Sequence, residues 1–565
     1  MLTEKTTMKN KSLLFMLVVS FLITTNGFAQ TKRDKVIPSL KKHISTLASD
    51  EFGGREPGTK GEVLAYTYIT NQFKEIGLEP KGTDNFLQEF TFVKSVFMSP
   101  ECNFSIAGKS LEAKKNYFLL PYSTEGSAVG TTLNVGFGIV SEKQQYDSYK
   151  EVRFPANSIF VMEYGTPDHA GPHTKYQDDA DIRTRIDNAI KHGALGVIFV
   201  NTDADEKDPE MDYSKRITAT SIPVVFVKGE LGASLKTNGV SVSIKSKFEK
   251  EEGTGHNVIG FIDNKSANTI VIGAHYDHLG MGGDGSLYRG EPAVHNGADD
   301  NASGVAALIE LARYLKQSNL KGNNYLIMAY SGEEKGLLGS GYFVKHPTLG
   351  LDKMNYMINM DMVGRLKSEE PTLLVNGVGT SSFWKIAMER ITIDSLKTKT
   401  TDSGVGPSDH TSFYLNNVPV LHFFSGTHSD YHKPSDDENL INYMGEARII
   451  DYIIQLIQKL DDKGKADFIK TKDDNNEDAP RFKVTLGVVP DYAFEGSGMR
   501  IDGITEGKPA SKAGLKAGDI VTQIGEVKVL DMMSYMKALG KFNKGEKATV
   551  HFMRGKEEKT AEVEF

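Results

Sequence analysis

The stretch N-G-A-D-D-N-A-S-G-V-A-A-L-I-E-L-A-R-Y-L, residues 296–315, decides the fold. Its second half places apolar residues at helical spacing, which predicts an amphipathic helix packed on a core. Apolar runs of strand length lie on both sides of it, T-I-V-I-G-A at 269–274 and Y-L-I-M-A-Y at 325–330. This alternation is typical of a largely parallel sheet covered by helices. The two adjacent aspartates before the helix, Asp299 and Asp300, are either a helix cap or metal ligands.

Two more apolar runs extend the same pattern along the chain. N-Y-M-I-N-M covers residues 355–360, and V-P-V-L-H-F-F covers residues 418–424. The expected fold class is therefore α/β, with a helix-covered, mostly parallel but mixed β-sheet. A small α/β insert and a β-rich C-terminal unit accompany this sheet domain.

Changes in composition and in the pattern of apolar residues indicate these further parts. Short strand-like runs surround one helical pattern, D-I-R-T-R-I-D-N-A-I-K-H-G, which predicts the α/β insert. A mostly charged stretch with the composition of a solvated linker precedes the C-terminal unit. The expected divisions are 1–29 (signal peptide), 30–124 (N-terminal part of the sheet domain), 125–250 (insert), 251–460 (main part of the sheet domain), 461–480 (linker) and 481–565 (C-terminal unit).

The beginning of the sequence has the features of an export signal. Three lysines precede the apolar run S-L-L-F-M-L-V-V-S-F-L-I at 12–23, and the small residues Gly27 and Ala29 follow it. This order predicts a cleaved signal peptide, although an uncleaved anchor is the alternative reading. The protein is therefore expected to be exported, to the periplasm or the extracellular space. No other stretch reaches transmembrane length, so no membrane span is expected after signal removal.

Composition limits the classes of partner. The 565 residues carry a formal net charge of −8, which argues against nucleic acid as a partner. Cys102 is the single cysteine, so an exported chain forms no internal disulfide. We expect Cys102 to be buried and structural.

Chemically active residues follow the strands of the predicted sheet. The carboxyl ends of parallel strands open on one edge, where such folds place their sites. Two histidines with three carboxylates can hold two zinc ions if one carboxylate bridges them. The residues concerned are His275 and Asp277, Asp299 and Asp300, Glu333 and Glu334, Asp361, and Asp430, Tyr431 and His432.

Spacing also suggests roles within this set. Residues two apart on a strand point the same way, so Asp277 could hold the free ring nitrogen of His275. Adjacent residues point apart, so one of Glu333 and Glu334 would bind metal while the other acts on the bound water. Of the aspartate pair, one would bridge and the other would support the loop. The remaining histidines of the region have no assigned role: His278, His295, His410, His422 and His428, of which the S-D-H at 408–410 is the most site-like.

Five motifs carry a resemblance to a known family. A-H-Y-D-H, G-A-D-D-N-A-S-G, S-G-E-E-x-G-L-x-G-S, N-M-D-M-V-G and D-Y-H-x-P-x-D resemble, in order, those of the secreted di-zinc aminopeptidases of metallopeptidase family 28. Glutamate carboxypeptidase, glutaminyl cyclase and the transferrin receptor share that fold. The resemblance covers about residues 36–125 and 250–460.

The resemblance implies two Zn²⁺ ions and a role for each residue. His275 and Asp361 would bind one zinc ion, Glu334 and His432 the other, and Asp300 would bridge, with Glu333 as general base and Asp277 orienting His275. It also implies a cis peptide bond after the bridging residue, at Asp300–Asn301. Tyr431, beside His432, is our candidate for hydrogen bonding to the developing oxyanion.

The flanking parts resemble known modules as well. The insert resembles a protease-associated domain, acting as a lid or substrate-access module, with an inert spacer as the alternative. Residues 481–565 resemble a bacterial PDZ domain, with T-L-G-V at 485–488 in the place of the carboxylate-binding loop. Such a domain would capture a peptide or protein C-terminus. Docking on the catalytic domain is the alternative.

The expected function is hydrolysis of N-terminal amino acids from peptides, by a water that the metals activate. A carboxypeptidase acting on acidic C-termini would need arginines near the site, and Arg289, Arg365 and Arg390 are the candidates. A glutaminyl cyclase is disfavoured because Trp384 is the only tryptophan. A binding protein that kept the fold and lost catalysis is the alternative from another class.

Overall fold

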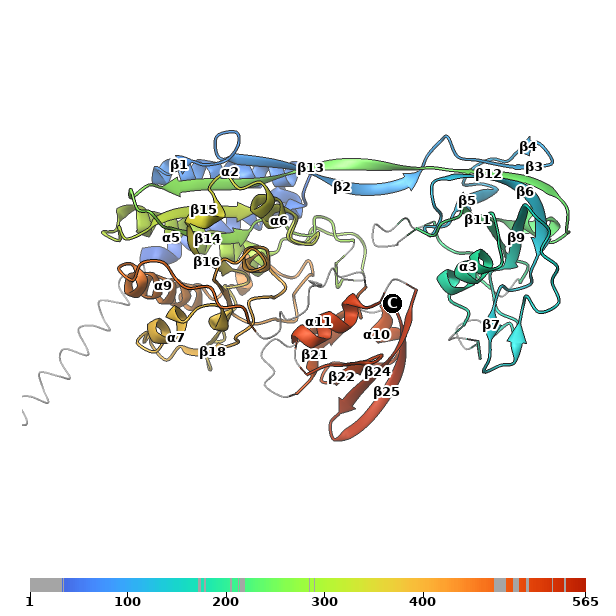
Figure 1. Ribbon diagram of the computed structural model, residues 1–565. Helices are drawn as coiled ribbons and strands as arrows, with labels where there is room; N and C mark the ends of the chain where they lie inside the picture. The colour runs from blue at the N-terminus through green and yellow to red at the C-terminus, as the bar shows by residue number, and fades with distance from the viewer. Residues whose placement is uncertain are drawn as a thin grey trace, which may run out of the picture. The chain divides into compact units, whose positions relative to one another are not determined.

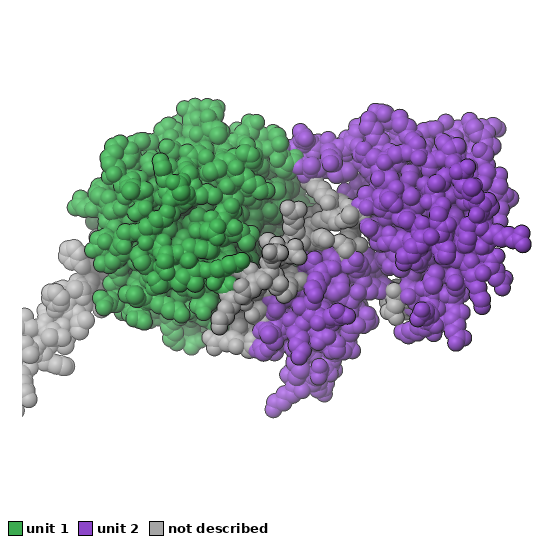
Figure 2. Space-filling view, in the orientation of Figure 1, with its two compact units in different colours: residues 1–92, 254–477, 491–495 green, residues 93–253, 478–490, 496–565 purple. Residues whose placement is uncertain are grey.

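The computed structural model describes residues 33, 35–170, 174–176, 179–203, 206–211, 213, 219–283, 285–288, 290–471, 484–490, 497–504, 508–530, 532–542 and 545–565. The expected signal peptide at 1–29 lies outside them. Among the described helices, none has the length and hydropathy to cross a bilayer. The chain divides into a first unit, residues 1–92, 254–477 and 491–495, and a second unit, residues 93–253, 478–490 and 496–565 (Figure 2).

A nine-stranded mixed sheet forms the centre of the first unit (Figure 1). Its middle strands β15, β14, β16 and β19 are parallel, while β13 and β17 pair antiparallel to them on either side. This confirms the expected helix-covered, mostly parallel sheet. In order across the sheet the strands are β1 (Glu79–Pro80), β13 (Phe248–Ile262), β15 (Asn324–Tyr330), β14 (Thr269–His275), β16 (Met354–Met360), β19 (Val420–Phe424), β17 (Thr372–Asn376) and β18 (Lys397–Thr400), and β2 (Leu87–Met98) also pairs with β13.

Helices cover this sheet because its middle strands are apolar throughout. Every residue of β14, β15 and β16 is buried, as expected of parallel strands with both faces covered. Helix α5 packs against β14, β15, β16, α2 and α9. The helical segments are 35–47, η1 (Asp50–Arg55), α2 (Lys60–Ile76), α5 (Gly304–Gln317), α6 (Leu338–Lys345), η4 (Leu351–Lys353), η5 (Val378–Thr380), α7 (Phe383–Met388), α8 (His410–Tyr414), η6 (Glu438–Leu440) and α9 (Tyr443–Leu460).

The segment before α5 is not a regular helix. A π-type turn, η3 (Ala298–Ser303), leads into α5, and Asp300 and Asn301 depart from helical φ and ψ within it. The peptide bond Asp300–Asn301 is cis, as the family resemblance implied. Close packing begins at Gly304, where a Cβ atom would lie 2.3 Å from Asn301 Oδ1 and 2.7 Å from the Met360 carbonyl oxygen.

The insert contains an eight-stranded sheet whose middle strands β6, β9, β10 and β11 are parallel. The long strands β2 and β13 carry the chain from the first unit into the second and back (Figure 1). Across the sheet the strands are β4 (Lys109–Ser110), β3 (Asn103–Ile106), β12 (Ser241–Ser246), β6 (Gly126–Asn134), β9 (Ser158–Glu163), β10 (Val197–Val200), β11 (Val224–Val227) and β5 (Tyr117–Leu119), with helices α3 (Ile182–Lys191) and α4 (Gly229–Ser234) and the pair β7 (Val140–Ser141) and β8 (Tyr146–Asp147).

This sheet starts earlier than the expected boundary at residue 125. Strands β3, β4 and β5 precede that residue, and they join the sheet because β3 pairs with β12 and β5 pairs with β11. Cys102 is buried beside β3 as a free thiol, and its Sγ donates a hydrogen bond to the Lys247 carbonyl oxygen at 3.0 Å. The expectation of a buried structural cysteine is therefore confirmed.

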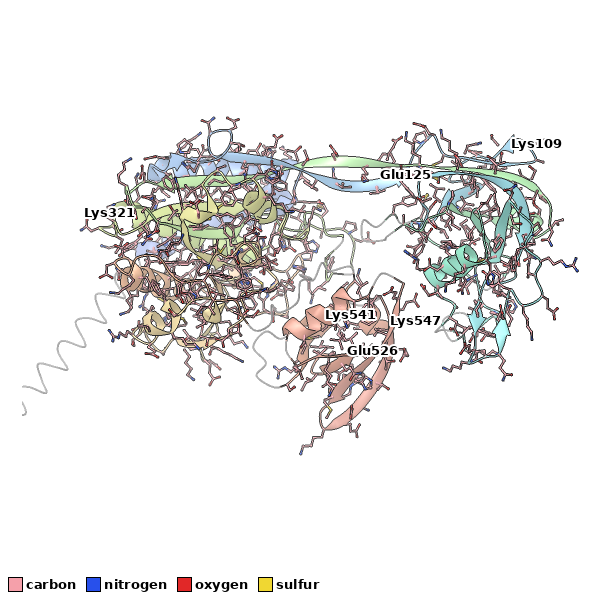
Figure 3. All side chains as sticks on the ribbon, in the orientation of Figure 1. Lys109, Glu125, Lys321, Glu526, Lys541 and Lys547 are labelled. Atoms are coloured by element: carbon pink, nitrogen blue, oxygen red, sulfur yellow. The ribbon has the colours of Figure 1, made fainter. Side chains whose placement is uncertain are left out.

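The described part of the C-terminal unit is β-rich, as expected. Charged side chains elsewhere on the chain, such as those of Lys109, Glu125 and Lys321, project from the surface (Figure 3). The C-terminal elements are β20 (Val488–Pro490), β21 (Met499–Ile504), α10 (Pro509–Lys512), β22 (Ile520–Ile524), β23 (Val527–Lys528), α11 (Met532–Gly540), β24 (Lys547–Arg554) and β25 (Glu557–Glu564).

The start of the expected linker at 461–480 is mostly exposed, as a linker would be, but hydrogen bonds tie it to the rest of the first unit. Asn355 donates to the Gly464 carbonyl oxygen at 2.9 Å and accepts from the Ala466 N–H at 2.7 Å. The Thr471 N–H donates to the Tyr414 hydroxyl at 2.9 Å. These contacts anchor residues 464–471 to the first unit, whereas residues 472–480 lie outside the described part of the chain.

Candidate metal centre

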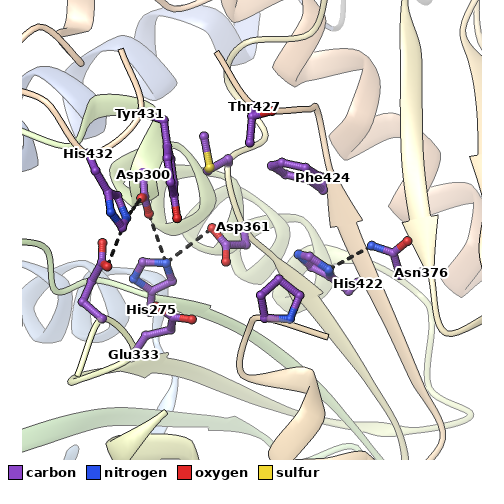
Figure 4. Close-up of a pocket in the computed structure, with 13 residues that line it drawn as sticks. His275, Asp300, Glu333, Asp361, Asn376, His422, Phe424, Thr427, Tyr431 and His432 are labelled. Carbon is purple, nitrogen blue, oxygen red and sulfur yellow. Dashed lines mark hydrogen bonds and ion pairs between the residues drawn. The ribbon is translucent and has the colours of Figure 1, made fainter. Parts of the chain in front are cut away.

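Three strand ends and two further loops bring the predicted site residues to one pocket. His275 is the last residue of β14 and Asp361 directly follows β16, while the glutamate pair follows β15. Figure 4 shows this pocket and the side chains that line it. Its lining includes His275, Asp300, Glu333, Glu334, Asp361, Tyr431 and His432.

Asp300 lies between two histidines and offers one oxygen to each. Its Oδ1 is 3.3 Å from His275 Nε2, and its Oδ2 is 3.2 Å from His432 Nε2. A second carboxylate completes each group: Asp361 Oδ1 is 3.4 Å from His275 Nε2, and Glu334 Oε2 is 3.1 Å from His432 Nε2. The side chains therefore form two donor triads that share Asp300.

The separations within each triad fit a metal ion. Zinc binds histidine nitrogen and carboxylate oxygen at roughly 2.0–2.2 Å in a tetrahedron, so its ligand atoms lie about 3.3 Å or slightly more apart. The nitrogen–oxygen distances of 3.1–3.4 Å match that spacing. The donors of the first triad, His275, Asp300 and Asp361, also lie close enough together to hold one ion. The residues present thus fit the expected metal.

Comparison with known proteins agrees with this geometry. Residues 257–457 match the model of "Peptidase family M28". The aminopeptidase YwaD of Bacillus subtilis is 30% identical over 436 residues, which cover 74% of this chain and 83% of that protein. The chain belongs to peptidase family M28. The expectation that it is a metallopeptidase-type enzyme is confirmed by this membership.

Other relatives of this M28 peptidase cover comparable lengths. The probable lipoprotein aminopeptidase LpqL of Mycobacterium tuberculosis is 25% identical over 71% of this chain and 76% of its own length. The solved structure described as BSAP, a zinc aminopeptidase from Bacillus subtilis, is 24% identical with a TM-score of 0.43, covering 78% of this chain and 98% of that one. Residues 469–565 match a PDZ domain model, which confirms the resemblance seen at the C-terminal unit.

Ion pairing opposes the effect of burial in the second triad of this M28 peptidase. Burial works against ionisation of Glu334, but His432 and His278 hold its pKa at about 2. Burial likewise opposes a charged His432, yet Glu334 and Asp300 raise its pKa well above the usual value. A bound divalent cation would replace the protons of the histidines, since metal ligands must be deprotonated.

Glu333 has a different environment from its neighbour. Burial raises its pKa well above the usual value, and the nearby Asp361, Glu334 and Asp409 add to that shift while His275 opposes it. Its backbone N–H donates to Asp277 Oδ1 at 3.1 Å. The two adjacent glutamates are therefore distinguished by surroundings: one is held ionised beside histidines and the other favours its protonated form.

Asp277 lies behind His275, on the side away from the triads. The Nδ1 atom of His275 is 3.2 Å from the Asp277 carbonyl oxygen and 3.7 Å from its carboxylate Oδ1. The carboxylate itself accepts the Glu333 N–H. Asp277 thus contacts both a predicted ligand and the predicted base. Tyr431 stacks on His432, with ring centroids 3.8 Å apart.

The two adjacent aspartates, Asp299 and Asp300, make different contacts. Asp299 Oδ1 accepts from the Gly364 N–H at 2.6 Å and from the Ser303 hydroxyl at 3.0 Å. Its Oδ2 is 3.2 Å from His428 Nε2. Asp299 therefore connects the loop before α5 to the loop after β16. Of the two aspartates, only Asp300 lines the pocket.

Sequence reasoning missed two residues that hold this loop in place. Asp436 Oδ2 accepts the backbone N–H groups of both Asp299 and Asp300, each at 3.0 Å. The fully buried Arg55 donates to the carbonyl oxygens of Tyr276 at 2.7 Å and Gly297 at 3.0 Å, among others. Asp436 ends the motif D-Y-H-x-P-x-D, so a signal was present there. Arg55 lies more than 200 residues before Tyr276 and Gly297, and its sequence context gives no such sign.

The unassigned histidines have different surroundings. His410 and His422 are stacked with ring centroids 4.4 Å apart, and it is His422 that lines the pocket. His295 faces the Ser286 hydroxyl at 2.7 Å. His278 reaches Glu334 at 2.7 Å and is the one nearest the triads.

Proposed function

We propose that this M28 peptidase is an exported, di-zinc aminopeptidase that releases N-terminal amino acids from peptides. The observation that carries the proposal is Asp300, whose two oxygens face two histidines, each paired with a further carboxylate. One ion would be held by His275 and Asp361 and the other by Glu334 and His432, with Asp300 bridging. The named aminopeptidases among its relatives support the same reading.

The chain's own residues would divide the chemistry between them. Bound zinc would supply Lewis-acid chemistry, lowering the pKa of a water and polarising the scissile carbonyl. Glu333 would take the proton from the attacking water at a carboxylate oxygen and deliver it to the leaving amine nitrogen. Burial raises the pKa of Glu333 well above its usual value, which suits a group that must both accept and return a proton. Tyr431 would donate its hydroxyl to the developing oxyanion, and Asp277 would keep His275 oriented.

The residues that the rival activities would need are not found among the described residues that line the pocket. Of the three arginines considered for a carboxypeptidase, Arg365 pairs with Asp430 at 3.2 Å, and no arginine is among the described residues that line the pocket. Trp384 is fully buried and donates its indole N–H to Thr380, so it packs in the core.

The other two parts would act on access and on partners. The insert, residues 125–250 with the earlier strands, would be a protease-associated lid that controls which peptides enter. The PDZ domain would bind a peptide or protein C-terminus at residues 485–488, which lead into strand β20 and include its first residue. Export rests on the signal-like features of residues 1–29.

The test is hydrolysis of a panel of aminoacyl-anilides beside N-blocked and C-terminal-acidic peptides. We expect cleavage of free-amino substrates that is lost with a chelator and restored by zinc. Release of C-terminal residues instead would contradict an aminopeptidase. Bound zinc without hydrolysis of any member of the panel would favour a binding protein on the same fold.

A further inference from the structure

His278 lies inside the metal centre: its ring, Asp300 and Glu334 offer donor atoms close enough together to hold an ion, although neither triad includes His278. Its Nδ1 is 2.7 Å from Glu334 Oε1, and the side chain is buried. The other oxygen of the same carboxylate, Oε2, is the one that faces His432 at 3.1 Å. Glu334 is therefore held from two sides, by a different oxygen on each.

Distances separate a hydrogen-bonding role from a metal-binding one. Atoms that share a tetrahedral zinc lie about 3.3 Å apart, whereas a charge-assisted N–H···O bond is roughly 2.7–2.9 Å long. The Nδ1–Oε1 distance of 2.7 Å has the hydrogen-bond length. The distance from His278 Nδ1 to Asp300 Oδ2 is 3.9 Å, whereas His432 Nε2 lies 3.2 Å from the same oxygen.

The ring of His278 is fixed by its neighbours. A Cβ atom on Gly297 would lie 2.6 Å from His278 Cδ2, so the ring occupies space that only glycine leaves open. The His432 ring meets it edge-on, with centroids 5.7 Å apart. Its Nε2 is buried without a hydrogen-bond partner among the described residues. A bare Nε2 lone pair is less costly to bury unpaired than an N–H, so the proton belongs on Nδ1, where Glu334 accepts it.

We propose that His278 is a positioning residue of the second metal site: its Nδ1–H holds Glu334 Oε1, so that Oε2 is presented to the ion. The inference rests on the proposed di-zinc function and adds a residue to it. Partners behind a metal ligand orient it, and their loss typically costs 10–100-fold in metal affinity. The second ion should therefore depend on His278 while the first, bound at His275 and Asp361, should not.

Zinc titration of the full-length, chelator-stripped protein tests this, with calorimetry and competition by a chromogenic chelator as readouts. We expect two binding steps in the wild type. His278→Ala should weaken one step by about 10–100-fold and leave the other within about threefold. His278→Asn places an amide N–H₂ where Nδ1 stands, so it should restore most of the lost affinity. Cobalt substitution should show the same loss and rescue in the visible absorption of one site.

A matched control is His43→Ala, because His43 is also buried and also faces a carboxylate, Glu310 at 3.5 Å, but does not line the pocket. His43→Ala should leave the zinc affinity of both binding steps unchanged. Equal zinc affinity in wild type and His278→Ala would overturn the inference, as would an asparagine variant as weak as the alanine one. A wild type that binds fewer than two zinc ions would instead overturn the proposed function.

Discussion

At the scale of single residues, Glu333 and Glu334 show how surroundings assign roles to identical side chains. Both are adjacent in sequence, and both line the pocket. His432 and His278 contact Glu334 and keep it ionised despite burial. Glu333 lies among carboxylates, and burial together with these neighbours raises its pKa. A site that separates the pKa values of two carboxyls in this way separates a ligand from a proton carrier.

The first prediction follows from that separation. Glu333→Gln keeps the size of the side chain and leaves both triads intact, so zinc content should stay at the wild-type value. Turnover of an aminoacyl-anilide should fall by about 10²–10⁴-fold, because general-base catalysis is lost. Metal analysis and steady-state kinetics on the same preparation check it. Near-normal turnover would remove Glu333 from the role of base.

Glu446 provides a second prediction at this scale, away from the pocket lining. It is completely buried in α9, and neither side-chain oxygen has a hydrogen-bond partner among the described residues. Burial, then Asp299 and Glu310, raise its pKa well above the usual value. The folded chain thus keeps a proton that the unfolded chain releases above about pH 4.5, so this group lowers stability as pH rises.

Glu446→Gln cannot ionise and should remove that penalty. The variant and the wild type should be equally stable near pH 4.5. Above it, the variant should gain up to about 1.4 kcal/mol per pH unit while the buried carboxyl stays protonated. Urea unfolding from pH 4.5 to 8 measures the difference. Glu310→Gln is the control of opposite sign: burial opposes ionisation there, but His43 and Ser39 lower the pKa of Glu310, so its loss should destabilise more as pH rises. A pH-independent difference for Glu446→Gln would contradict the argument.

At the scale of elements, the sequence was most informative where the burial of apolar residues alone determines the structure. The apolar runs at 269–274, 325–330 and 355–360 became β14, β15 and β16, because strands covered on both faces must be apolar along their whole length. The residues after them then reached one sheet edge as a consequence of parallel topology. Sequence alone therefore located His275 and Asp361 at the pocket.

Prediction was weaker where pairing is set by partners far along the chain. Strands β3 and β5 are short, and they are held by β12 and β11, more than 100 residues later. The charged composition of residues 461–471 concealed the anchoring of Ala466 by Asn355. His278 was left without a role for the same reason: its partner Glu334 is 56 residues away, and no spacing rule links the two.

The junction between η3 and α5 carries an element-scale prediction. Asn301 Oδ1 accepts the N–H of Gly304 at 3.0 Å and of Met362 at 3.1 Å, which joins the helix start to the end of β16. Gly304→Ala would place a Cβ against that oxygen and displace the residue next to Asp300. We expect a loss of about 1–3 kcal/mol in stability together with weaker zinc binding.

The comparison variant is Gly341→Ala in α6. The nearest atom to a Cβ there is Ser412 Oγ at 4.0 Å, so the added methyl makes only an ordinary van der Waals contact. It should stabilise by up to about 1 kcal/mol through helix propensity and leave zinc affinity unchanged. Unfolding curves and zinc titration on both variants distinguish a steric effect at the junction from a general effect of glycine replacement. Equal behaviour of the two variants would contradict the steric argument.

At the scale of the whole molecule, the metal centre belongs to one unit. Every residue of the two triads lies between His275 and His432, in the first unit, while the described strands of the insert and of the PDZ domain lie in the second. The triads also join segments that are remote in sequence, the ends of β14, β15 and β16 and the loop after β19. Metal bound there links these segments only in the folded state, so its binding energy should stabilise the first unit.

Zinc removal should therefore lower the unfolding temperature of the first unit and leave the other unfolding transitions unchanged. A ligand that binds only the folded state adds about 4 kcal/mol when its free concentration is 1,000 times its Kd. Calorimetry of chelator-stripped protein should show the transition of the first unit several degrees lower, with the remaining transitions unmoved. Zinc should restore it, and magnesium at equal concentration should not, because histidine nitrogens suit zinc and magnesium prefers oxygen ligands. Equal shifts of all transitions, or no shift, would show that the metal centre does not support the sheet that builds it.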